Sequence, residues 1–109
     1  MTMTPRKLAL SLGLPLAAAT IALPSVAVPA FALSGDYAAS GVYIRSGPHT
    51  SNTALGLGYP GQGATISCFT EGTNISGNPY WDHNRDQATG VTGYSADYYM
   101  SWTGTLYHC

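Results

Sequence analysis

The chain has 109 residues, which is enough for one domain. Charged residues make up only 8% of it, with four cationic against five acidic side chains and a formal net charge of −1. Because Lys7 is its last lysine, the chain offers few groups to phosphates, so nucleic acid and anionic membrane surfaces are poor partners for it.

The first 32 residues have the features of a secretory signal peptide. Arg6 and Lys7 form a short cationic start, and an uncharged, mostly apolar run follows over residues 8–28. Ala30 and Ala32 then provide the small side chains that suit a signal peptidase, so we expect cleavage after Ala32 and a secreted, extracellular product. An uncleaved membrane anchor is the competing interpretation, because about 20 apolar residues can span a bilayer. Glycine and proline interrupt this run, however, which favours the signal peptide.

Cleavage would leave a small acidic domain. Removing 32 of the 109 residues leaves 77, which keep all five acidic residues and two arginines, for a net charge of −3. A domain of this size buries a modest core and often needs a cross-link for stability. Residues 33–40 are small and polar, which predicts a flexible lead-in, and residues 41–109 are expected to form the folded domain. We expect no stable membrane insertion after cleavage.

The first strand signal lies at residues 41–48, which read Gly-Val-Tyr-Ile-Arg-Ser-Gly-Pro. Val42 and Ile44 are expected to face the core, because successive side chains of a strand point to opposite faces. Tyr43 and Arg45 would then point the other way. The Ser-Gly-Pro sequence ends the strand in a turn.

Short strands and turns continue to the end of the chain. Strand patterns recur at residues 54–59, 64–70, 80–85 and 91–95, separated by a polar loop at 49–53, a Pro-Gly turn at 60–63 and a loop rich in glycine, asparagine and serine at 71–79. Residues 96–99 predict one turn of 3₁₀ helix, and residues 103–109 predict a last extended segment. No stretch after the leader has helical periodicity of useful length. The predicted fold is therefore all-β, a small barrel or sandwich of about five to six short strands with one 3₁₀ turn.

The two cysteines, Cys68 and Cys109, both lie in the exported part of the chain. An even count in an oxidising compartment favours one disulfide between them. That bond would close a loop of about 40 residues, for which the chain-entropy model gives roughly 4 kcal/mol. Two free thiols or an intermolecular bridge are the alternatives. In the strand at residues 64–70, Ala64, Ile66 and Cys68 are expected to face the core.

Several of these segments, taken in order, resemble bacterial SH3 domains. Residues 42–48 resemble the opening strand and turn of that family, and Gly56 with residues 60–66 resembles its second strand, glycine turn and third strand. Trp81 matches its fourth strand, and residues 93–100 resemble its closing strand, 3₁₀ turn and final aromatic and apolar pair. The resemblance covers nearly all of the chain after the leader and implies an SH3-like barrel.

The chain departs from the family pattern in three places. Tyr94 stands where tryptophan is usual, and the loop at residues 71–79 is longer than typical. A tail over residues 101–109 extends beyond the core fold and carries Cys109. Forms with such a disulfide-tethered tail resemble small secreted proteins of actinobacteria.

Residue patterns for catalysis or cofactor binding are weak. Cys109 directly follows His108, and a cysteine held in a disulfide has no thiolate to offer, so a thiol enzyme is not expected. The G-x-G-x-x-G match at residues 56–61 precedes a strand instead of a helix, which argues against a dinucleotide site. His49 and His83 lack the spacing of metal ligands. We therefore predict no catalytic residues, no metal and no cofactor.

Arg45 has two interpretations. Its guanidinium can bind carbonyl groups of the adjacent turn or an acidic side chain, or it can contact the carboxylate of a ligand. We favour the structural role, because the resemblance places this arginine beside the turn of the family motif.

The aromatic side chains are the best candidates for a binding site. The exported part holds eight tyrosines and two tryptophans, more rings than so small a core can bury. Trp81 and Tyr94 are assigned to the core from their strand positions. The rings expected to be exposed and to contact a ligand are Tyr43, Tyr80, Tyr98, Tyr99 and Trp102. Alternatively, these rings only cover the ends of the barrel.

We therefore predict a secreted, non-catalytic binding module that works as a monomer. The resemblance implies that its ligand is cell-wall peptidoglycan or another extracellular peptide, bound in a shallow groove between the loops at residues 49–53 and 71–79. Asn78, Asp82 or Arg45 would supply polar contacts. The alternative is a secreted inhibitor or effector that binds a protein partner, which the small size, the leader and the disulfide fit equally well.

Overall fold

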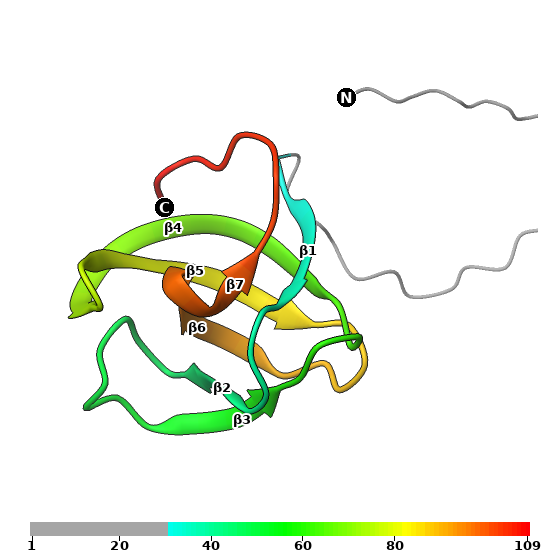
Figure 1. Cartoon of the computed structure of the whole chain (residues 1–109), viewed down its shortest axis with the longest axis horizontal. Helices are drawn as coiled ribbons and strands as arrows, with labels where there is room; N and C mark the ends of the chain where they lie inside the picture. Colours follow the sequence, from blue (N-terminus) through cyan, green and yellow to red (C-terminus); the bar gives the residue numbers. More distant parts are fainter. Residues whose placement is uncertain (1–30) are drawn as a thin grey trace, which may run out of the picture.

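The computed structural model describes residues 31–109, which form one curled sheet of seven strands. Across the sheet the strands follow the order β3-β2-β6-β5-β4-β1-β7, and every neighbouring pair is antiparallel. Figure 1 shows the long β4 arching over β5 and β6, with β2 and β3 on the opposite side of this half-barrel. The predicted all-β fold with one 3₁₀ turn is confirmed for this part of the chain. Its elements are β1 (Leu33–Tyr37), β2 (Val42–Arg45), β3 (Ala54–Gly58), β4 (Ala64–Ile75), β5 (Asn78–Asp86), β6 (Thr92–Ala96), the 3₁₀ turn η2 (Asp97–Tyr99) and β7 (Met100–Ser101).

Strand β1 occupies most of the segment predicted as a flexible lead-in. It pairs with β4 on one side, where Leu33 faces Ile66, and with β7 on the other, where Tyr37 faces Met100. The Tyr37 side chain is 1% exposed, and its hydroxyl donates a 2.8 Å hydrogen bond to Asn84 Oδ1. The prediction of a flexible lead-in is wrong for this strand, because its pairing with β4 and β7 and the burial of the Tyr37 ring hold it in the sheet. Together β1 and β7 raise the number of strands above the predicted five to six.

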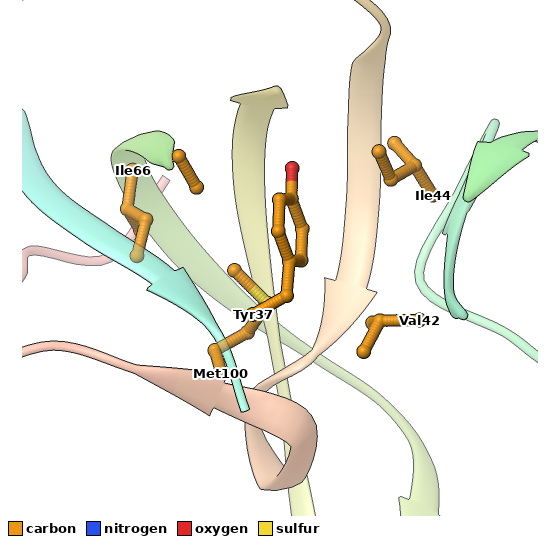
Figure 2. Packing of buried hydrophobic residues seen from close by; sticks show 6 residues of the cluster. Tyr37, Val42, Ile44, Ile66 and Met100 are labelled. Carbon is orange, nitrogen blue, oxygen red and sulfur yellow. The ribbon is translucent and has the colours of Figure 1, made fainter. Parts of the chain in front are cut away.

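The core is centred on the ring of Tyr37. Figure 2 shows this ring between Ile66 and Met100 on one side and Val42 and Ile44 on the other. All five side chains are at most 9% exposed. Burying each of them stabilises the fold by about 1.5–3 kcal/mol. The predicted inward faces of Val42 and Ile44 in β2 and of Ala64 and Ile66 in β4 are therefore confirmed. Cys68 was also predicted to face the core, but a register shift after Ile66 leaves it half-buried and outside the core cluster.

A two-residue turn replaces the long loop predicted at residues 71–79. Strands β4 and β5 continue until Ile75 faces Asn78, and the Ser76 and Gly77 between them have φ angles of 52° and 91°. Positive φ at both central positions is typical of the tight turns that close β-hairpins. The loop prediction is therefore wrong. A register shift near the end of β4 interrupts the alternation of its side chains, which hides the hairpin in the sequence.

The tip of the β4–β5 hairpin packs against the loop between β2 and β3, as Figure 1 shows at the left. Thr73 N donates to Pro48 O at 3.1 Å, and Thr50 N donates to Thr73 Oγ1 at 3.2 Å. Gly72 lies so close to the loop that a Cβ atom at its position would overlap the Pro48 carbonyl oxygen. These contacts hold together the two segments that were predicted to flank a groove.

Replacing Gly72 with alanine is expected to lower the free energy of unfolding by about 2 kcal/mol or more, because backbone must move to admit the methyl group. Alanine at Ser51, an exposed residue of the β2–β3 loop, is the control and should change it by less than about 0.5 kcal/mol. Urea denaturation followed by tryptophan fluorescence measures both variants. Equal midpoints for Gly72→Ala and the unmodified protein would contradict this packing.

The C-terminal tail runs back along β4 and ends in the predicted disulfide. Cys68 and Cys109 are bonded, with their Cα atoms 4.9 Å apart, and the described part of the chain has no free cysteine. Phe69 N donates to Tyr107 O at 3.0 Å, and Cys109 N donates to Phe69 O at 2.8 Å. The intramolecular disulfide is therefore confirmed, and it is compatible with an extracellular location.

The predicted signal peptide lies outside the described residues, apart from Phe31 and Ala32. Among residues 31–109, no helix has the length and hydropathy needed to span a membrane.

Candidate ligand-binding pocket

A pocket of about 290 Å³ lies between the β2–β3 loop, the tip of the β4–β5 hairpin, β2 and the 3₁₀ turn. Its wall takes side chains from the β1–β2 connection, β2, the β2–β3 loop, the hairpin tip, β5, the end of β6 and η2. This volume is at the lower end of ordinary ligand pockets, enough for about one or two amino-acid residues. The largest side chains of the wall belong to Tyr43, Arg45, Ile75, Trp81 and Tyr99.

Trp81 is fixed at the pocket by burial and by a hydrogen bond. Its side chain is 2% exposed, and Nε1 donates to Thr73 O at 2.8 Å. Because the amide and hydroxyl of Thr73 also bind the β2–β3 loop, hydrogen bonds connect the indole, the hairpin tip and that loop. The predicted core position of Trp81 is confirmed, and the indole also forms part of the pocket wall.

Arg45 has its guanidinium held from two directions. Nη1 donates to Asn52 O at 2.9 Å, and Cζ lies 4.4 Å from the centre of the Tyr43 ring. Stacking of a guanidinium on an aromatic face is attractive and restricts its position. The bond to Asn52 confirms the predicted structural role of Arg45 beside the turn. The side chain also belongs to the pocket wall, so the two interpretations of this residue are compatible.

Four of the five predicted contact rings are exposed, but they do not form one site. Tyr43 and Tyr99 line the pocket and are 52% and 39% exposed. Tyr98 packs edge-on against Tyr99, with ring centroids 5.1 Å apart, but does not itself line the pocket. Tyr80 is exposed but packs against Phe69 and does not line the pocket.

Trp102, the fifth predicted ring, is half-buried and joins two acidic side chains. Its Nε1 lies 3.0 Å from both Asp82 Oδ2 and Asp97 Oδ1. Asp82 is fully buried, so the ligand contact predicted for it is wrong. Burial, together with the neighbouring Asp97 carboxyl, raises the pKa of Asp82 to about 8. Asn78, the other predicted polar contact, donates to Asp97 Oδ2 at 2.9 Å and does not line the pocket.

A serine–histidine pair lies outside the pocket. Ser67 Oγ and His83 Nδ1 are 2.8 Å apart, and burial lowers the pKa of His83. Ser67 is the extra residue of a β-bulge, and its hydroxyl also lies 3.2 Å from the His83 carbonyl oxygen. Tyr94, predicted in the core, is half-buried and packs edge-on against His83. These contacts join the two strands at the bulge, and in the region that the structure describes no carboxylate pairs with His83.

The pocket also contains residues that no local sequence pattern indicates. Ile75 reaches it because the β4–β5 hairpin is longer than expected, and Ser40 reaches it because β1 holds the preceding segment in the sheet. Thr50 and Ile75 come from the two segments that were predicted to flank a groove. The Ser-Gly pair at residues 76–77 is the turn signal that could have indicated the hairpin.

The chain matches no model of a known protein family, and a search of curated proteins gave no match. Within residues 31–109, no group of three or more His, Cys, Asp or Glu side chains is placed to hold a metal ion. The function is therefore inferred from the pocket and the sequence motifs.

Proposed function

We propose that this protein is a secreted, non-catalytic binding module that holds an extracellular peptide, in the first instance a peptide of the bacterial cell wall. The observation that supports it best is a pocket that combines the exposed rings of Tyr43 and Tyr99 with the fixed indole of Trp81. Aromatic rings of this kind offer a large contact area with a polar tip at a small cost in conformational entropy. Hydrogen bonds through Thr73 hold the loops in place before a ligand arrives, which lowers the cost of binding.

The ligand class in this proposal rests on the sequence. Residues 42–48 and 93–100 resemble bacterial SH3 domains, and that resemblance implies cell-wall peptides as ligands. The leader at residues 1–32 and the disulfide support an extracellular site of action.

The second candidate is a secreted inhibitor or effector whose ligand is a folded protein. Strand β3 lies at the edge of the sheet, and its Leu55 and Leu57 side chains are 50% and 40% exposed. An edge strand that carries exposed apolar side chains favours association with another chain. This candidate predicts contact through β3 instead of through the pocket.

Retention on purified bacterial sacculi tests the first candidate. We expect the unmodified protein to be retained and the Tyr43→Ala, Tyr99→Ala double variant to bind about tenfold more weakly or worse, because buried aromatic contacts dominate binding energy. Tyr80→Ala is the matched control, since Tyr80 is similarly exposed but lies outside the pocket. Equal retention of the double variant and the control would contradict binding in the pocket.

A further inference from the structure

Arg45 is a cation without an anionic partner in the described part of the chain. Its guanidinium makes one hydrogen bond there, from Nη1 to Asn52 O. The salt bridge found among residues 31–109 joins His108 to Glu71, with 2.7 Å between Nε2 and Oε1. The remaining N–H groups of Arg45 are therefore available to a ligand at the pocket wall.

Every acidic side chain of residues 31–109 is engaged away from Arg45. Asp36 and Asp86 accept hydrogen bonds from backbone amides. Asp82 and Asp97 share the indole N–H of Trp102, and Glu71 pairs with His108. The positive charge at the pocket is thus not paired with a carboxylate of the described chain, so an anionic ligand would meet no competing partner at Arg45.

The rest of the pocket wall is mostly apolar. Val42, Ile75 and Trp81 contribute hydrocarbon surface, while Ser40 and Thr50 add hydroxyl groups. A pocket with one cationic side chain and a mostly apolar wall suits a ligand that carries one negative charge next to an apolar group. A phosphate group carries nearly two negative charges at neutral pH, and the single positive charge of Arg45 would neutralise only part of them.

We propose that the pocket binds the free C-terminal carboxylate of a peptide whose last side chain is apolar. The planar guanidinium of Arg45 donates hydrogen bonds to both carboxylate oxygens, and the last side chain of the peptide contacts Trp81. The hydroxyl groups of Ser40 and Thr50 bind the peptide backbone. This inference rests on the proposed function and names the end of the peptide that the pocket takes.

Two probes that differ only at their C-terminal group test the inference. N-acetyl-alanyl-leucine and its C-terminal amide are titrated separately into the 15N-labelled protein, and the shifts of the backbone amides of the pocket are followed. We expect the carboxylate form to bind about tenfold more tightly or better, because a hydrogen bond to a charged group is stronger than one to a neutral group. Equal affinities of the two probes for the unmodified protein overturn the inference without any variant.

Arginine variants identify the group responsible. Arg45→Gln is expected to bind the carboxylate probe no more tightly than the amide probe, whereas Arg45→Lys retains part of the preference. Arg85→Gln removes the same charge outside the pocket and should bind both probes as the unmodified protein does. Thermal denaturation checks that Arg45→Gln is folded, because Arg45 also holds the turn. An unchanged preference in folded Arg45→Gln would overturn the inference.

Failure of this inference differs from failure of the proposed function. If neither probe binds while retention on sacculi still depends on Tyr43 and Tyr99, the carboxylate inference is overturned and wall binding stands. If N-acetyl-leucine binds as tightly as the dipeptide, the pocket recognises small acids instead of a peptide end, which also overturns it. Loss of both retention and probe binding overturns both proposals.

Discussion

The Asp82→Asn variant is expected to be more stable than the unmodified protein at pH 8 and equally stable near pH 4. Asp82 is fully buried, and its pKa is about 8 in the folded chain against 3.8 for an ordinary aspartate. A raised carboxyl pKa means that its contribution to stability is fully present below pH 3.8 and is lost as the pH rises towards 8. Since each pKa unit corresponds to about 1.4 kcal/mol, we expect a gap of a few kcal/mol at pH 8.

Asparagine suits this test because it has the shape and hydrogen-bonding capacity of a protonated aspartate. Its side-chain oxygen can accept from Trp102 Nε1 and its amide can donate to Asp97. Asp36→Asn is a matched control of opposite sign, because the amide of Gly61 lowers the pKa of Asp36. The Asp36 carboxylate therefore stabilises the fold at neutral pH, and that contribution is lost as the pH falls below about 4.

Urea denaturation of the three proteins at several pH values between about 2.5 and 8 measures these differences, because the contribution of Asp36 changes only at the acidic end. Titrating groups that all three share cancel in the comparison with the unmodified protein. A difference between Asp82→Asn and the unmodified protein that stays constant over this pH range would show that Asp82 does not hold its proton in the folded chain.

Removing the disulfide by the Cys68→Ala, Cys109→Ala double substitution is expected to lower the free energy of unfolding by about 4 kcal/mol. The two cysteines are 41 residues apart in the sequence, and the loss of loop-closure entropy in the unfolded chain gives this figure. Small domains have a total stability of about 5–15 kcal/mol, so the variant is expected to be only marginally folded at room temperature. Urea denaturation under oxidising conditions measures the loss.

The loss of local stability should be largest where the C-terminal tail pairs with β4. Hydrogen exchange of the backbone amides at positions 69 and 109, which bind the tail to β4, is expected to accelerate more than that of Ile66 in the middle of the sheet. Reduction of the unmodified protein provides the control, because it breaks the same bond without changing the sequence. A loss below about 1 kcal/mol would show that the hydrogen bonds of the tail hold it in place without the disulfide.

The fold is predictable from the sequence where the signal is local. Alternation in residues 42–45 predicts the inward faces of Val42 and Ile44, and the even cysteine count predicts the disulfide. Strand β1 lacks such a signal, since Tyr37 is the only large ring of residues 33–40. What fixes this strand is its pairing with β4 and β7, which lie far along the chain.

Strand β5 shows a second limit of sequence patterns. Its buried face carries Asp82, Asn84 and Asp86, whereas hydrophobic alternation assumes apolar residues inside. Buried polar groups are tolerated when they are hydrogen-bonded. Their partners here include the hydroxyl of Tyr37 and the indole of Trp102, which come from distant segments. No local pattern contains this information.

The candidate site is predictable in kind but not in arrangement. The excess of large rings over the available core predicts exposed tyrosines, and Tyr43, Tyr80, Tyr98 and Tyr99 are exposed. Only the folded chain shows that Tyr43 and Tyr99 share a pocket while Tyr80 lies outside it. That grouping depends on the length of the β4–β5 hairpin, whose turn lies beyond the register shift in β4.

Strands β1 and β7 are neighbours in the sheet although they lie near the two ends of the described domain. The core around Tyr37 therefore stays incomplete until Met100 is in place. A chain that emerges from a channel with its N-terminus first cannot close this core on the way, and contacts between distant residues also slow folding. The topology thus lets the core close only when nearly all of the described domain is present, and a chain cut short before β7 leaves the Tyr37 ring incompletely covered.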